Sequence, residues 1–143
     1  MPLHLVKLCV GVDSFEDLAG WIAAEQAAGG GQPVEDVHRT RMMPKRADEI
    51  LDGGSLYWVI RGRIQVRQRI LALRAETGAD GVPRCAIVLE PELVPVVPRQ
   101  HRPFQGWRYL AAADAPADLA RAPAGIDEMP AEMRAALADL GLL

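Results

Sequence analysis

The strongest constraint on the fold is a pair of strand-like segments joined through one glycine, Gly62. Residues 55–61 are rich in Tyr, Trp, Val and Ile, which favour strands. Residues 63–73 are apolar and basic in alternation, and Gly62 permits a tight turn between the two segments. Consecutive strands joined by so short a turn run antiparallel. We therefore expect a hairpin within a mainly antiparallel, curved sheet or small barrel.

The remaining patterns add strands and helices around this hairpin. An apolar run at 3–10 predicts a strand buried on both faces, and helical spacing predicts a helix from Phe15 to about Ala28 that is capped by Ser14. Weaker signals indicate extended chain at 38–43, a short helix at 45–51, strands at 85–89 and 104–110, and a proline-rich edge strand or irregular crossing over 91–100. Beyond these, we expect an Ala/Pro-rich loop with one helical turn at 111–125 and a C-terminal helix at 130–140. We expect one domain over 1–143. Its class is α+β: a mainly antiparallel curved sheet or small barrel with two or three flanking helices.

The segment 63–73 is the first candidate binding surface. Ile64, Val66 and Ile70 are expected on one face of the strand. The other face would carry Arg63, Gln65, Arg67 and Arg69 at intervals of about 7 Å. The pattern shifts to Leu71 and Leu73 after Arg69, which predicts a bulge. This basic face could follow a sugar–phosphate backbone, or it could be the ordinary solvated face of a sheet.

Charge is distributed unevenly along the chain. Residues 38–108 hold 13 Lys+Arg against 7 Asp+Glu, whereas the rest of the chain holds 3 against 12, within a formal net charge of −3. Five of the seven aromatic residues lie in or directly beside this basic window. Arginines with aromatics can bind phosphates and stack on bases, so any affinity for nucleic acid must be local.

Residues 98–109 form the densest basic and aromatic segment. Its candidate binding residues are Arg99, Gln100, His101, Arg102, Gln105, Trp107 and Arg108. Glutamine offers a donor and an acceptor to a base edge, and Trp107 or Trp58 could stack on a base. Alternatively, Phe104 and Trp107 plug the end of a barrel while the arginines pair with acids.

A third group contains Arg39 and Arg41, followed by Lys45 and Arg46. Arg39 and Arg41 share one face of an extended segment, and the start of a short helix favours anions. The group could hold one phosphate. It could equally pair with the acids of the helix that follows.

Several functional classes have no motif in the sequence. We find no P-loop, dinucleotide fingerprint, zinc-protease motif or nucleophile elbow. Cys9 and Cys85 lie in apolar runs without ligand spacing, so we expect buried thiols, no metal and no cofactor. No apolar run is long enough to cross a membrane, and we expect a cytoplasmic protein. His101, with Glu90 and Glu92 available, is the one candidate for acid–base catalysis.

Two long segments resemble a known family. The sequences HRTRMMPKRADEILDGGSLYWVIRGRIQVRQRILAL, at 38–73, and RCAIVLEPELVPVVPRQHRPFQGWRYL, at 84–110, resemble the bacterial domain-of-unknown-function family 1489, and PRQHRPFQGWRYL is the most specific part. That resemblance implies one compact domain and no particular activity. Ile50-Leu51-Asp52-Gly53-Gly54 before a strand is also similar to PUA-like and ASCH-like domains, small curved barrels that recognise RNA or modified nucleotides. Ser55 and Trp58-Val59-Ile60 depart from the ASCH-like pattern, so no site residue is carried over.

The leading hypothesis is an RNA- or nucleotide-binding domain without an assigned reaction. The expected phosphate contacts are Arg63, Arg67, Arg69, Arg99 and Arg102, with Gln100 or Gln105 reading a base edge. One alternative is a small hydrolase or transferase acting on an anionic metabolite, with His101 as acid or base. Another is a protein-interaction module, in which the acidic ends pack on a basic partner or on the chain's own basic face.

Overall fold

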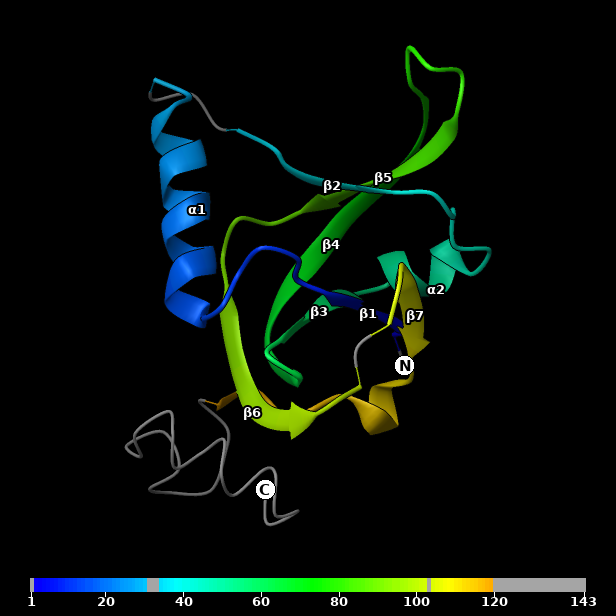
Figure 1. The fold of residues 1–143 in the computed structure, drawn as a ribbon. Coiled ribbons are helices and arrows are strands. Elements are labelled where there is room, and N and C mark those ends of the chain that lie inside the picture. Colours follow the sequence, from blue (N-terminus) through cyan, green and yellow to red (C-terminus); the bar gives the residue numbers. More distant parts are fainter. Residues whose placement is uncertain (1, 31–33, 103, 120–143) are drawn as a thin grey trace.

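The computed structural model describes residues 2–30, 34–102 and 104–119. Within these ranges, seven strands form one open, curved and mostly antiparallel sheet with two α-helices (Figure 1). The elements in chain order are β1 (His4–Leu8), α1 (Phe15–Ala27), β2 (Asp36–Thr40), α2 (Ala47–Leu51), β3 (Ser55–Ile60), β4 (Arg63–Thr77), β5 (Pro83–Leu89), β6 (Val94–Gln100), β7 (Trp107–Leu110) and the 3-10 helix η1 (Ala112–Asp114). The α+β class is confirmed.

Strand β4 organises the sheet because it pairs with three other strands. Its first half lies between β3 and β6, and its second half pairs with β5 (Figure 1). The sheet order is β2-β5-β4-β3-β1-β7, with β6 also paired to β4. The predicted hairpin is confirmed, since Ile60 pairs with Arg63 across a turn of Arg61 and Gly62.

Two bulges bend β4, and only one of them follows from the sequence. The register with β5 shifts between Ile70 and Ala72, which confirms the bulge expected after Arg69. A second irregularity lies between Ile64 and Val66. Ile64 and Val66 consequently pack in different core clusters, so the prediction of one apolar and one basic face along 63–70 is wrong.

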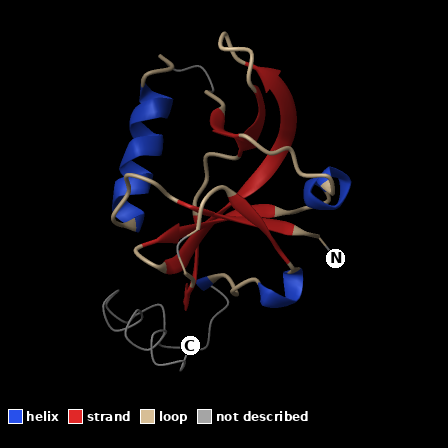
Figure 2. Ribbon diagram, turned by 45° about the vertical axis from the view of Figure 1, so that its right-hand side comes forward, coloured by secondary structure: helices blue, strands red, loops and turns tan. Residues whose placement is uncertain are grey.

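The sheet is buried on both faces near its centre. Strand β1 is an interior strand of the sheet and lies between β3 (parallel) and β7 (antiparallel). The larger core cluster includes Leu18 and Ile22 of α1, and the smaller one includes Val59, Ile64 and residues near η1. Figure 2 shows α1 lying well apart from the short η1 helix. Helix α1 therefore packs on the larger core cluster, and the chain around η1 packs on the smaller one.

The other predicted elements are present where they fall on described residues. Helix α1 begins after Ser14, whose hydroxyl accepts a hydrogen bond from Asp17 N. Strand β6 pairs with β4 alone among the named strands, as expected for a proline-rich edge, and η1 is the expected helical turn after residue 111. The predicted helix at 130–140 lies outside the described residues. No helix in the described ranges has the length and apolar character needed to span a bilayer.

Candidate functional site

Pairing of β4 with β6 brings two of the arginine-rich segments together. Arg63 is opposite Gln100, Ile64 is opposite Arg99, and the backbone N–H of His101 donates to Gly62 O at 2.9 Å. The β3–β4 turn therefore lies beside the end of β6. We call the arginines of this turn, of the end of β6 and of the chain that follows it the basic end. Its members are Arg61, Arg63, Arg99, Arg102 and Arg108.

Aromatic rings connect Arg108 to the rest of the basic end. The guanidinium carbon of Arg108 lies 5.2 Å from the centre of the Phe104 ring, which itself lies 4.9 Å from the His101 ring. Arg108 also donates to the carbonyls of Gln105 and Trp107. Within the described residues, no ion pair joins Arg61, Arg102 or Arg108 to an acid. The expectation that Arg102 and Arg108 pair with acids is therefore not met there.

The turn at the basic end has an unusual residue in its first position. Arg61 has φ of +52° and Gly62 has φ of +76°, a combination typical of a type I′ turn. Asn, Asp and Gly are preferred at that first position because a larger L-residue is strained with positive φ. Arg61 is the only such non-glycine residue in the described ranges. A strained arginine at an exposed turn is compatible with a functional role for its side chain.

Two residues expected to bind a ligand have mainly structural contacts. The Nε1–H of Trp107 donates to Met42 O at 2.8 Å, and its ring packs edge-on against Tyr109. The guanidinium of Arg99 donates to the backbone carbonyl of Asp114. Trp107 thus anchors β7 to the 42–46 segment, and Arg99 anchors η1 to β6.

The expected acid–base group around His101 does not form. Nδ1 of His101 lies 2.9 Å from the carbonyl oxygen of its neighbour Arg102. Glu90 and Glu92 precede β6, whereas His101 follows it, and a seven-residue strand separates the two ends by roughly 20 Å. The carboxylates instead line a hollow with Arg67 and Arg69.

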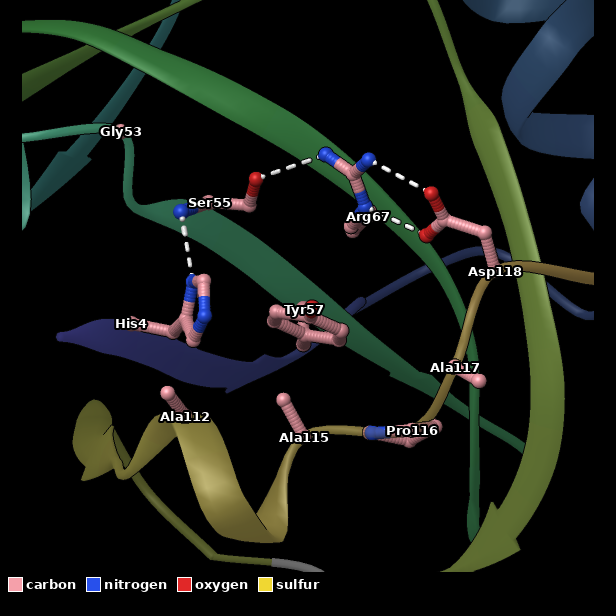
Figure 3. A pocket seen from close by; sticks show the side chains of 10 residues that line it. All are labelled: His4, Gly53, Ser55, Tyr57, Arg67, Ala112, Ala115, Pro116, Ala117 and Asp118. Carbon is pink, nitrogen blue, oxygen red and sulfur yellow. Dashed lines mark hydrogen bonds and ion pairs between the residues drawn. The ribbon is translucent and has the colours of Figure 1, made fainter. Parts of the chain in front are cut away.

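Arg67 occupies a different environment from the basic end. Its Nε and Nη2 donate to the two carboxylate oxygens of Asp118 at 2.8 and 2.9 Å, and Nη1 donates to Ser55 Oγ at 3.0 Å (Figure 3). The side chains of Arg67 and Asp118 are 24% and 18% exposed. The hydrogen bond with Asp118 is the main cause of the raised pKa of Arg67, so the ion pair persists at neutral pH. One acid of the C-terminal part therefore does contact the basic window.

The Arg67 hollow has a volume of about 310 Å³ and is bounded by β1, β3, β4 and the chain after β7 (Figure 3). Its lining comprises His4, Gly53, Ser55, Tyr57, Arg67, Ala112, Ala115, Pro116, Ala117 and Asp118. Nδ1 of His4 accepts a hydrogen bond from the backbone N–H of Ser55 at 3.0 Å. Burial, reinforced by the charge of Arg67, lowers the pKa of His4. His4 is therefore neutral at pH 7 and carries its proton on Nε2.

A second hollow adjoins the first, because Gly53 and Arg67 line both. It has a volume of about 330 Å³ and also contains Arg69, Glu90 and Glu92. The predicted phosphate contacts Arg67 and Arg69 thus face carboxylates. Asp118, Glu90 and Glu92 outnumber Arg67 and Arg69 around the two hollows. These five residues therefore provide no excess of positive charge that would attract a polyanion.

Trp58, a predicted stacking residue, is buried and cannot reach a base in this structure. It is 1% exposed, and its Nε1–H donates to Gln68 Oε1 at 2.8 Å. Gln68 Nε2 in turn donates to Asp36 Oδ2 at 2.7 Å and to Glu90 O at 2.9 Å. Burial alone would raise the pKa of Asp36, but hydrogen bonds from His38 and Gln68 outweigh it and lower that pKa. This chain of buried polar groups joins β2, β3 and β4.

The third predicted group is divided by the fold. Arg39 forms an ion pair with Glu76 at 2.9 Å, and Arg46 pairs with Glu49 on α2. The acid-paired alternative is confirmed for Arg46. Arg41 is exposed just after β2. The described residues contain no group of three or more His, Cys, Asp or Glu that could hold a metal, and both cysteines are buried as free thiols.

The comparisons with known proteins give one match. The family described as "Protein of unknown function (DUF1489)" has a model that matches residues 5–143. The chain belongs to this family. No curated protein and no solved structure matches the chain. The family resemblance expected from the two quoted segments is confirmed, and it carries no activity to the sites described above.

Sequence reasoning missed four residues of the Arg67 hollow: His4, Ser55, Tyr57 and Asp118. They come from three separate parts of the chain, and no local motif joins them. One signal was present in Gly53-Gly54 before Ser55. Gly54 has no room for a Cβ, which would collide with the carbonyl oxygens of Leu3 and Ile50. This close approach positions β1 beside the start of β3, and thereby His4 beside Ser55.

Proposed function

We propose that the protein is an RNA- or nucleotide-binding domain whose basic end contacts phosphates. The observation that carries this proposal is the β4–β6 register, which places the β3–β4 turn beside Arg99–Arg102. Arg61 and Arg102 are exposed, and Arg108 is exposed beside Phe104. Guanidinium groups spaced along one end of a sheet provide the local attraction that a chain of net charge −3 otherwise lacks.

The same end offers contacts for a base. Phe104 and His101 are half-buried and adjacent, and Arg108 covers the Phe104 ring. Aromatic and guanidinium planes stack on unpaired bases, while Gln100 and Gln105 are exposed nearby and can bind a base edge. In this proposal the His101–Phe104 pair replaces Trp58 and Trp107 as the stacking surface.

The PUA-like comparison belongs to this proposal as well. A curved sheet with a short helix ending in Ile-Leu-x-Gly before a strand is the feature shared with such RNA-recognition domains, and here α2 ends in Ile50-Leu51-Asp52-Gly53 before β3. We also place the protein in the cytoplasm, where RNA and nucleotides are available. A metabolite enzyme built on His101 has no carboxylate partner in the described structure to support it.

Binding across a salt series tests the proposal. The purified chain is titrated with labelled single-stranded RNA, structured RNA and duplex DNA at several salt concentrations. We expect RNA binding that weakens steeply with salt, because each phosphate contact to a single strand contributes about 0.7 to the slope of log K against log salt. The absence of RNA binding at low salt would refute a phosphate-contacting surface.

Paired variants locate the contacts. Arg102→Gln combined with Arg108→Gln should lower the affinity and reduce the salt slope by about 1.4 if each arginine contacts one phosphate. The matched control is Arg74→Gln, which removes an arginine at the other end of β4, where Arg74 pairs with Glu35 at 2.7 Å. An unchanged slope in the double variant, or an equal loss in the control, would exclude the basic end as the site.

A further inference from the structure

One edge of β4 has no partner strand over the second half of its length. The sheet order places β3 and β5 on opposite edges of β4. Strand β3 pairs with β4 only as far as Ser55, which lies opposite Arg69, and Gly54 O then accepts a hydrogen bond from Ile70 N at 3.0 Å. Beyond Ile70, the described residues contain no strand on this edge. We call residues 73–77 of β4 the open edge.

The hydrogen-bond alternation between β4 and β5 shows which backbone groups face the open edge. In an antiparallel ladder, residue pairs that exchange hydrogen bonds alternate with pairs that do not. Gly78 N donates to Val82 O at 3.3 Å, so positions 76 and 74 also direct their N–H and C=O groups at β5. The residues between them direct these groups the other way, and the described residues give them no backbone partner there. They are Leu73, Ala75 and Thr77.

The open edge lacks the features that usually prevent an edge strand from pairing with another chain. It lies in the β4–β5 hairpin, which projects from the rest of the molecule (Figure 1). It contains no proline, glycine or lysine, and Ala75 and Thr77 are exposed. Its two charged residues, Arg74 and Glu76, have opposite signs. An edge with charges of one sign repels a copy of itself, whereas this edge can attract one.

One antiparallel register satisfies both the backbone groups and the charges. With a two-fold axis at Ala75, Leu73 lies opposite Thr77 of the second copy, and the two Ala75 residues face each other. These are the residues with open backbone groups, so each donates and accepts across the axis. Arg74 then lies opposite Glu76 on both sides of the axis. A shift of the axis by one residue would instead place Arg74 opposite Arg74, or Glu76 opposite Glu76.

The ion pairs within the chain agree with this register. Arg74 pairs with Glu35 at 2.7 Å and Glu76 pairs with Arg39 at 2.9 Å, and all four side chains are substantially exposed. A contact between Arg74 and Glu76 across the axis would therefore continue a row of alternating charge from one copy to the other. Neither existing ion pair has to break.

We propose that two copies of the chain associate through antiparallel pairing of their open edges, which joins the two sheets into one. The contact is short, so the dimer is weak and depends on protein concentration. The axis lies roughly 40 Å along β4 from the β3–β4 turn, which leaves both basic ends uncovered. A failure of the dimer would therefore leave the RNA-binding proposal unaffected.

Sedimentation equilibrium and amide hydrogen exchange test the association. We expect a monomer–dimer equilibrium, with exchange at Leu73, Ala75 and Thr77 that slows as the protein concentration rises. A monomer at every concentration up to about 1 mM would overturn the proposal. Slow exchange at these three amides in a monomer would also overturn it, because the edge would then be covered by another part of the same chain.

Two charge reversals test the register. Arg74→Glu or Glu76→Arg alone places like charges opposite each other twice, and each should weaken dimerisation about tenfold. An equimolar mixture of the two variants should dimerise as tightly as the wild type, because each altered edge then faces one of opposite charge. Arg102→Glu is the control, since it makes the same charge change at the basic end, and it should leave dimerisation unchanged. Single variants that dimerise like the wild type, or a mixture no tighter than its components, would exclude this interface.

Discussion

Replacement of Arg61 by Asn should stabilise the fold and weaken RNA binding at the same time. Arg61 has positive φ in the two-residue turn between β3 and β4. This conformation costs a typical L-residue about 1–2 kcal/mol, and Asn tolerates it much better. We therefore expect a gain of about 1 kcal/mol in the free energy of unfolding, or about 3 °C in Tm for a chain of 143 residues.

Urea denaturation and thermal unfolding measure the stability, and the RNA titration measures the function. Arg41→Asn is the control, because Arg41 is also exposed and has no positive φ. It should show no such gain. If Arg61→Asn is no more stable than the wild type, the reasoning from backbone strain is wrong. If the variant is more stable and binds RNA with unchanged affinity, Arg61 is not part of the binding surface.

Two further variants test the elements that position the sites. Gly54→Ala should destabilise the protein by about 3 kcal/mol, because its Cβ would collide with backbone oxygens of Leu3 and Ile50, and chemical denaturation measures this loss. Gln68→Leu should cost about 3 kcal/mol, since it removes partners from Trp58 and Asp36 in the core. The lowered pKa of Asp36 contributes stability that is present above its unfolded-state pKa and lost as the pH falls through its folded-state pKa. Without Gln68, acid unfolding should therefore begin at a higher pH, and a circular-dichroism titration that shows no such shift would contradict this account.

The local patterns predicted most of the elements because they depend on neighbouring residues. The hairpin through Gly62, helix α1 after Ser14 and the bulge after Arg69 each follow from a turn residue, a cap or a change of period within a few positions. The irregularity between Ile64 and Val66 was not predicted, because no local pattern marks it; it is present in the pairing of β4 with β3 and with β6 alike. That one bulge separates Arg63 from the face that carries Arg67.

The sequence by itself determined the α+β class, the order of the elements in the described ranges and the family membership. It also identified the arginine-rich segments, but it did not determine which groups pack around each arginine. Strand pairing at long sequence separation placed Arg99 beside the β3–β4 turn and gave Arg67 an acid from position 118. Only the tertiary structure decided these contacts, because the charge that an arginine presents depends on the groups packed around it and not on its neighbours in the chain.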